Sequence, residues 1–178
     1  MKRFLVLATL AGLAVSLAGV AQAGPAEPTV PAKVAVPEGH KLFLVGHASG
    51  FQVHECTATG WRFVGPLANL YDDNGKLLTT HFGGPSWQAG DGSKVTAMLD
   101  GDAAITVDPA AIPWLRLRVT SATSGADGDR LAATTYIQRL ETTGGLAPTP
   151  ETCHAGTVGQ VARIPYTAVY AFWKATGN

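Results

Sequence analysis

The chain has 178 residues, of which 46% are hydrophobic, 21 are glycine and 11 are proline, and its formal net charge is zero at pH 7. This length suits one domain with a single buried core, and the apolar content excludes a disordered chain. The charge balance disfavours a nucleic-acid or anionic-membrane module, the glycine and proline content disfavours a helical bundle, and two cysteines exclude a disulfide-dense miniprotein.

The N-terminus has the pattern of a cleavable signal peptide. Basic Lys2 and Arg3 precede an apolar run over residues 4–20, and Ala21-Gln22-Ala23 supplies the small residues of a cleavage site. The alternative is a membrane anchor, but the run is marginal in length for spanning a bilayer. We therefore expect residues 1–23 to be removed. The mature protein, with 11 basic and 13 acidic residues, is then periplasmic or extracellular without stable membrane insertion.

Four prolines within residues 24–37 predict an extended linker, so the domain proper is expected to span residues 38–178. Turn-rich segments separate β-prone runs, and one of them, Asp72–Gly75, has the composition of a hairpin turn. We predict an all-β, mostly antiparallel fold, a β-sandwich or a barrel, with at most one or two short helices. A helix is possible near residues 66–70 or 109–112. The predicted strands are residues 40–45, 51–56, 94–99, 114–121, 131–140, 161–164 and 169–173.

Two segments carry a clear period of two. Residues 51–56 alternate apolar and polar side chains, which is typical of a half-buried strand. At the C-terminal end, alternation places Tyr170 and Phe172 on one face and Trp173 on the other, so these aromatic residues are expected to close the core.

Cys56 and Cys153 are predicted to form a disulfide, because two cysteines in an exported chain most often pair. The alternative is a zinc or copper site that adds His54, two residues before the first cysteine, and His154, directly after the second. This spacing does not match a compact zinc motif, so we expect no metal site.

The segment from His81 to Trp87 contains a histidine, a glycine pair and a tryptophan, a combination that suits ligand binding. His81 titrates near neutral pH, and Asp91 follows closely enough to orient it across a hairpin. These residues are candidates for a site. The alternative is a glycine turn between two strands, with Trp87 in the core and His81 bonded to the backbone.

Two further strands carry candidate residues. Trp114 shares a strand face with two arginines, which suits a planar or anionic ligand, although the same face also suits plain solvent exposure. In the next strand Tyr136 and Gln138 share one face, and Ile137 and Arg139 share the other. A buried Arg139 would need a carboxylate partner, with Asp91 and Glu141 as candidates.

The order of several short motifs resembles one known family, the exported domain of unknown function 3455. The resemblance runs from about residue 50 to residue 173 and implies an exported β-rich domain, with no activity or cofactor to carry over. The motifs are Gly50–Cys56 with Trp61, Asp73–Lys76, Thr80–Trp87, Asp91–Val95, Ile112–Leu115, Thr135–Arg139, Gly144-Gly145 with Cys153, and Arg163–Ala168.

Three functions from different classes follow. The favoured one is an exported binding module for a small molecule, a glycan or an envelope component, with no cofactor and no nucleic-acid partner. Its candidate ligand-binding residues are His81, Trp87, Asp91, Trp114, Tyr136 and Arg139. The second is an envelope enzyme that uses a His81–Asp91 dyad, although the chain lacks phosphate-loop, dinucleotide and zinc-protease motifs. The third is a metal-binding protein that uses His54, Cys56, Cys153 and His154. The sequence does not indicate the oligomeric state.

Overall fold

The structure, a computed structural model, describes residues 24–177. The predicted signal peptide, residues 1–23, lies outside the described residues. The strands are β1 (His40–Thr57), β2 (Gly60–Tyr71), β3 (Leu77–Phe82), β4 (Ser86–Ala89), β5 (Lys94–Ile105), β6 (Trp114–Thr123), β7 (Thr134–Gly144) and β8 (Val161–Ala175). Two short 3-10 helices complete the chain, η1 (Ala32–Val34) and η2 (Pro150–Thr152). No helix in this part of the chain is long and apolar enough to cross a membrane.

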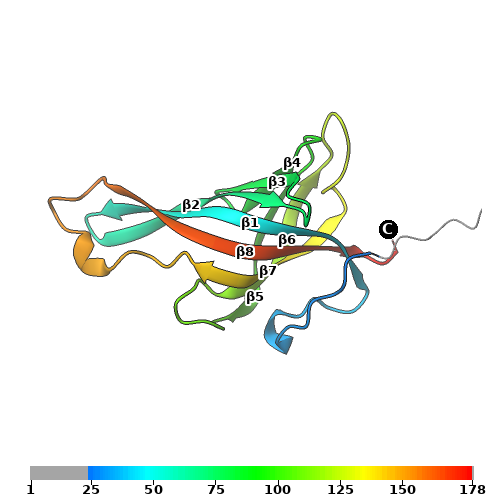
Figure 1. Ribbon diagram of the computed structural model, residues 1–178, viewed down its shortest axis with the longest axis horizontal. Coiled ribbons are helices and arrows are strands. Elements are labelled where there is room, and N and C mark those ends of the chain that lie inside the picture. Colours follow the sequence, from blue (N-terminus) through cyan, green and yellow to red (C-terminus); the bar gives the residue numbers. More distant parts are fainter. Residues whose placement is uncertain (1–23, 178) are drawn as a thin grey trace, which may run out of the picture.

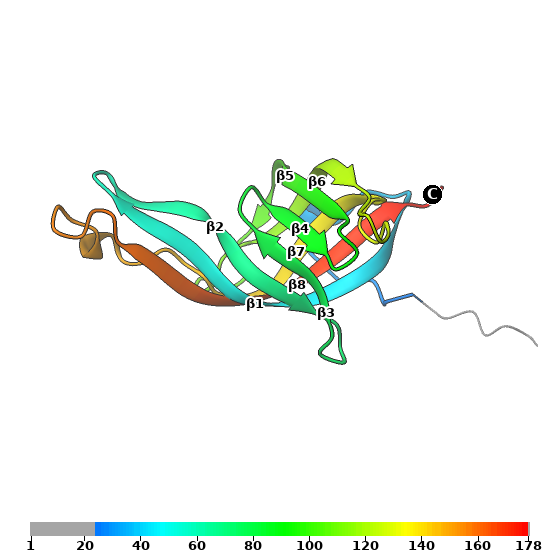
Figure 2. The same cartoon turned by 90° about the horizontal axis from the view of Figure 1, so that it is seen from above.

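The strands form one closed antiparallel barrel. Each strand pairs with its neighbours in the sequence, and β8 closes the sheet by pairing with β1. Figure 1 shows β1 and β8 running side by side, and Figure 2 shows the strands wound around a common interior. The predicted all-β antiparallel fold is confirmed, and of the two architectures expected the chain adopts the barrel.

Alternate residues of each strand point into the barrel, as the strand geometry requires. Large side chains such as Leu70, Trp87 and Phe172 share this interior with alanines from the other strands. The inner face of β1 includes Gly50, where an added Cβ would lie 2.3 Å from the carbonyl oxygen of Leu67. No side chain fits there, so β1 and β2 can approach closely only because this residue is glycine.

The boundaries of several predicted elements were wrong. Residues 40–45 and 51–56 belong to the single strand β1, and residues 161–164 and 169–173 belong to the single strand β8. Pro165 is tolerated inside β8 because β7 pairing ends beside it, where its carbonyl oxygen accepts the backbone N–H of Gly145. The short helix considered at residues 66–70 or 109–112 forms at neither place, since residues 66–70 lie in β2 and residues 109–112 form a turn. The alternation at the C-terminal end is confirmed: Tyr170 and Phe172 lie inside the barrel and Trp173 outside.

The proline-rich segment before β1 packs against the outer wall of the barrel. Val34 is completely buried, and its carbonyl oxygen accepts a hydrogen bond of 2.7 Å from the side-chain amide of Gln138. The oxygen of the same amide accepts the indole N–H of Trp173 at 2.8 Å. Gln138 therefore has partners on both sides, and this buried polar group fixes the segment to β7 and β8.

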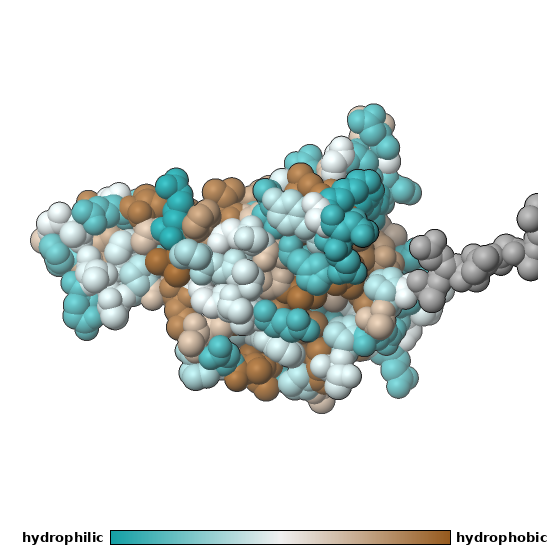
Figure 3. Space-filling view, in the orientation of Figure 1, coloured by the Kyte–Doolittle hydropathy of each residue, from teal (hydrophilic) through white to brown (hydrophobic). Residues whose placement is uncertain are grey.

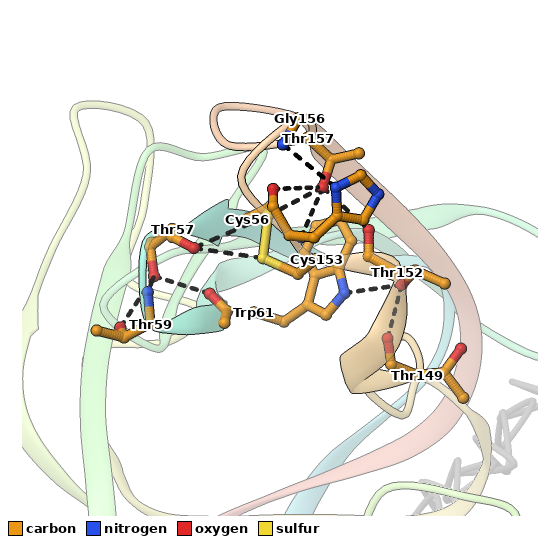
Figure 4. The surroundings of a disulfide bond; sticks show 11 residues. Cys56, Thr57, Thr59, Trp61, Thr149, Thr152, Cys153, Gly156 and Thr157 are labelled. Carbon is orange, nitrogen blue, oxygen red and sulfur yellow. Dashed lines mark hydrogen bonds between the residues drawn. A yellow bond between two sulfur atoms is a disulfide. The ribbon is translucent and has the colours of Figure 1, made fainter.

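A long arm extends from one end of the barrel and consists of residues 53–65 and 146–164 (Figure 1, left). A disulfide joins Cys56 of β1 to Cys153, with the two Cα atoms 5.4 Å apart, which confirms the predicted pair. Figure 4 shows the hydrogen bonds around it, including one of 3.0 Å from the indole N–H of Trp61 to the Thr152 hydroxyl. The arm is thus held together by a covalent bond as well as by strand pairing.

The double substitution Cys56→Ser and Cys153→Ser is expected to lower the free energy of unfolding by about 2–5 kcal/mol, because the disulfide closes a long loop and so restricts the unfolded chain. Urea unfolding followed by circular dichroism measures this loss. Reductant should destabilise the wild type and leave the double variant unchanged. Equal urea midpoints for the disulfide-bonded wild type and the double variant, both without reductant, would contradict the prediction.

Candidate ligand-binding site

The hairpin of β3 and β4 brings His81 and Trp87 face to face. The turn at residues 83–85 contains Gly84 with φ of 76°, a left-handed conformation that glycine adopts without strain. The resulting register places His81 directly opposite Trp87, and both side chains point into the barrel. Their rings stack with centroids 4.1 Å apart and planes 8° apart. Two motif residues chosen from the sequence therefore form one aromatic unit.

His81 is neutral in this position. Its Nδ1 lies 2.9 Å from the carbonyl oxygen of Ser86, so Nδ1 carries the proton and donates it, which leaves Nε2 as the acceptor. Burial lowers the pKa of His81 to about 3, against the opposing effect of the Ser86 hydrogen bond, and the positive charge of Arg139 lowers it further. The imidazole is consequently a hydrogen-bonding group rather than a cation at neutral pH.

The stacked pair lies at the base of a cavity of about 280 Å³ inside the barrel. The base of this cavity is buried, whereas Phe63 and Leu99 are 51% and 40% exposed and lie at its mouth. The mouth is at the end of the barrel from which the arm extends, and hydrophobic residues gather near the junction of arm and barrel in Figure 3. The lining residues are Gln52, Phe63, Pro66, His81, Pro85, Trp87, Leu99, Leu115, Leu117 and Arg139.

Arg139 is the charged residue in this lining. Its Nε and Nη2 donate hydrogen bonds of 3.1 and 2.9 Å to the carbonyl oxygen of Pro113, and its guanidinium also lies near the Tyr170 hydroxyl. The predicted carboxylate partners, Asp91 and Glu141, were wrong, because among the described residues Arg139 forms no ion pair.

Two buried donors in the cavity lining have no acceptor. The side-chain amide nitrogen of Gln52 and the indole nitrogen of Trp87 are both buried without a hydrogen-bond partner. The Tyr166 hydroxyl lies near the Gln52 side chain, but the two groups do not meet in hydrogen-bond geometry. Leaving a buried donor unpaired costs about 1–3 kcal/mol. Native proteins rarely keep such groups without a reason, and one reason is that a ligand supplies the missing acceptor.

Asp91 does not reach His81. Its carboxylate accepts the hydroxyl and the backbone N–H of Ser93 and the backbone N–H of Arg130, and these bonds hold the pKa of Asp91 below its usual range. Asp91 therefore connects the turn before β5 to the loop before β7. The predicted dyad does not form, because the hydrogen bond of His81 goes to a backbone carbonyl instead.

Trp114 and Tyr136 lie outside the barrel. Leu115 and Leu117 point into the cavity, so alternation puts Trp114 on the outer face of β6. Tyr136 packs in an outer cluster beneath the N-terminal segment, and its ring meets that of His40 with centroids 4.9 Å apart. The structure thus brings together His81, Trp87 and Arg139 among the six candidates, and it separates the other three from them.

The alternative metal site does not form. Both cysteine sulfurs are joined in the disulfide, so neither thiolate is free to bind a metal. No cluster of three or more potential ligand side chains occurs within residues 24–177.

Gln52 was missed because a half-buried strand is expected to turn its apolar side chains inward, whereas in residues 51–56 the polar side chains of Gln52 and His54 are the buried ones. Phe51 is 38% exposed, whereas Gln52 and His54 are buried. The phase of β1 is set by Ala48, which packs in the interior, and counting by twos from Ala48 places Gln52 inside as well. Counting from that alanine would have identified Gln52 as an inward-pointing polar residue.

Stability is expected to fall in mild acid because of His81. Below pH 6.5 the imidazole of His81 takes up a proton in the unfolded chain, whereas in the native chain it stays unprotonated until about pH 3. The free energy of unfolding therefore decreases as the pH falls from about 6.5 towards 3. Between pH 7 and pH 5 the loss is about 2 kcal/mol. Urea unfolding of the wild type and His81→Phe at both pH values measures it, with His154→Phe as the control at an exposed histidine. Equal pH dependence in wild type and His81→Phe would contradict the assignment.

The comparison with protein families supports the resemblance noted from the motifs. A family model described as a protein of unknown function (DUF3455) matches residues 37–174, which include every strand of the barrel except the last residue of β8. Neither curated proteins nor solved structures give a match. The chain therefore belongs to the DUF3455 family.

Proposed function

We propose that this protein is an exported binding protein that holds a small molecule in the barrel cavity. The observation that carries the proposal is the pair of unpartnered buried donors, Gln52 Nε2 and Trp87 Nε1, which line the same cavity. Ligand sites are typically concave and mostly apolar, with a few convergent polar groups. The cavity has this composition, since leucine, proline and aromatic side chains surround those two donors, His81 and Arg139.

The size and the walls of the cavity favour a small, partly apolar ligand over a glycan. An apolar cavity of about 150 Å³ in another protein binds benzene, so about 280 Å³ accommodates a substituted ring. Leu115, Leu117 and the Trp87 indole offer apolar surface, whereas a sugar would need hydroxyl partners on all sides.

Export is supported by two features of the chain. The leader pattern over residues 1–23 is that of a cleavable signal peptide. The disulfide between Cys56 and Cys153 suits the oxidising conditions of the periplasm or the extracellular space.

The binding proposal is tested by closing the mouth of the cavity. Leu99→Trp places an indole at the exposed rim and is expected to abolish binding of ring-sized fragments such as toluene, phenol, benzamide and benzoate, as observed by saturation-transfer NMR. Met98→Trp is the matched control, because Met98 is the neighbouring residue on β5 and is 49% exposed but does not line the cavity. Fragment binding that survives Leu99→Trp, or no fragment binding to the wild type, would contradict the proposal.

Gln52→Met separates binding from stability. Methionine has a similar shape without the unpaired donor, so the ligand-free protein is expected to gain about 1 kcal/mol in unfolding free energy while fragment binding weakens. Thermal unfolding and the same NMR titration measure the two effects. A loss of both stability and binding would indicate that Gln52 serves packing alone.

A further inference from the structure

We infer that the ligand of this cavity is an organic anion, a carboxylate attached to a small planar apolar body, with its charged group on Arg139. This inference rests on the proposed function and identifies the class of ligand. Arg139 brings a positive charge into a largely apolar cavity, and no carboxylate of the described residues pairs with it.

Of the three arginines without an ion pair among residues 24–177, Arg130 and Arg163 are exposed, whereas Arg139 is not. Arg116 and Arg118 both pair with Asp100, at 2.9 and 3.7 Å, and Arg62 pairs with Glu55. Arg139 is half-buried, yet its hydrogen-bond acceptor is the neutral carbonyl oxygen of Pro113. A charge removed from water without a counter-ion is unfavourable, so an anionic ligand would gain from providing one.

The neighbouring titratable groups do not neutralise this charge. Burial keeps His81 uncharged, as its lowered pKa shows. Burial also raises the pKa of Tyr166 and of Tyr170, so both hydroxyls stay protonated although Arg139 opposes the shift. At neutral pH the cavity and its floor therefore carry a net positive charge.

The unpaired donors fit the same class of ligand. Gln52 Nε2 and Trp87 Nε1 each lack an acceptor, and the guanidinium of Arg139 offers N–H groups beyond the two that bind Pro113. A carboxylate supplies two oxygen acceptors and is the planar partner that arginine binds in a bidentate manner. The flat face of the apolar body would lie against the walls formed by Leu115 and Leu117.

Three pairs of compounds that differ in charge but hardly in size test the inference: benzoate and benzamide, phenylacetate and phenylacetamide, and 3-phenylpropionate and 3-phenylpropionamide. Isothermal titration at pH 7 and low salt gives the dissociation constants for the full chain without its leader. We expect at least one acid to bind tenfold or more tightly than its amide. Arg139→Gln should reduce that preference to twofold or less, whereas Arg139→Lys should keep most of it.

The matched control is Arg118→Gln, the same substitution at an arginine of the neighbouring strand β6 whose side chain is 53% exposed and does not line the cavity. It should leave the preference for the acid intact. If acids and amides bind equally and Leu99→Trp abolishes the binding of both, the ligand is not specifically an anion. That result would overturn this inference and leave the proposed function standing. Failure of all six compounds to bind the wild type would overturn both.

Discussion

Closure of the sheet by β8 against β1 is the constraint on which the rest of the molecule depends. A closed barrel of eight strands has an interior just wide enough for side chains to fill, and each strand must send every second side chain into it. Aromatic and aliphatic residues such as Leu70, Tyr170 and Phe172 fill part of this space. Beyond Trp87 the lining changes to Gln52, His81 and Arg139, and there the interior is hollow.

The hollow end owes its character to polar residues that strand alternation forces inward. On β1, Ala48 faces inward, so Gln52, four residues later, does too. On β7, Ile137 faces inward, so Arg139, two residues later, does too. Inward polar groups are costly to stability unless they are paired. Gln138 shows the opposite solution, since it is equally buried outside the barrel but has a partner at each end of its amide. This contrast between Gln52 and Gln138 is the reason that we propose a binding role for Gln52 and a structural one for Gln138.

The fold class and the disulfide could be predicted from sequence because both rest on local or compositional features. Turn residues and alternating runs indicate strands, and two cysteines in a chain with a leader pattern are expected to pair. The strand boundaries were harder, because Gly46, Gly50 and Pro165 look like interruptions and are tolerated only where a particular neighbour lies beside them. His81 and Trp87 could be chosen together because a short turn forces them opposite each other. Asp91 was grouped with them because it lies close in the sequence, but its carboxylate is used within its own turn and by the loop before β7. Trp114 and Tyr136 were chosen by residue type, and both lie on the outer face of the wall.

The position of the disulfide also has a mechanical consequence. The covalent bond between Cys56 and Cys153 encloses β2 to β7 in a single loop, while β1 before Cys56 and all of β8 lie outside it. The two ends of the described chain enter the seam at the same end, where His40 pairs with Ala175. Tension applied between them would separate β1 from β8 one rung at a time, starting at that pair. The separation would stop at the sulfur bridge, and the covalent path of the force would then run through that bridge and bypass the backbone of β2 to β7.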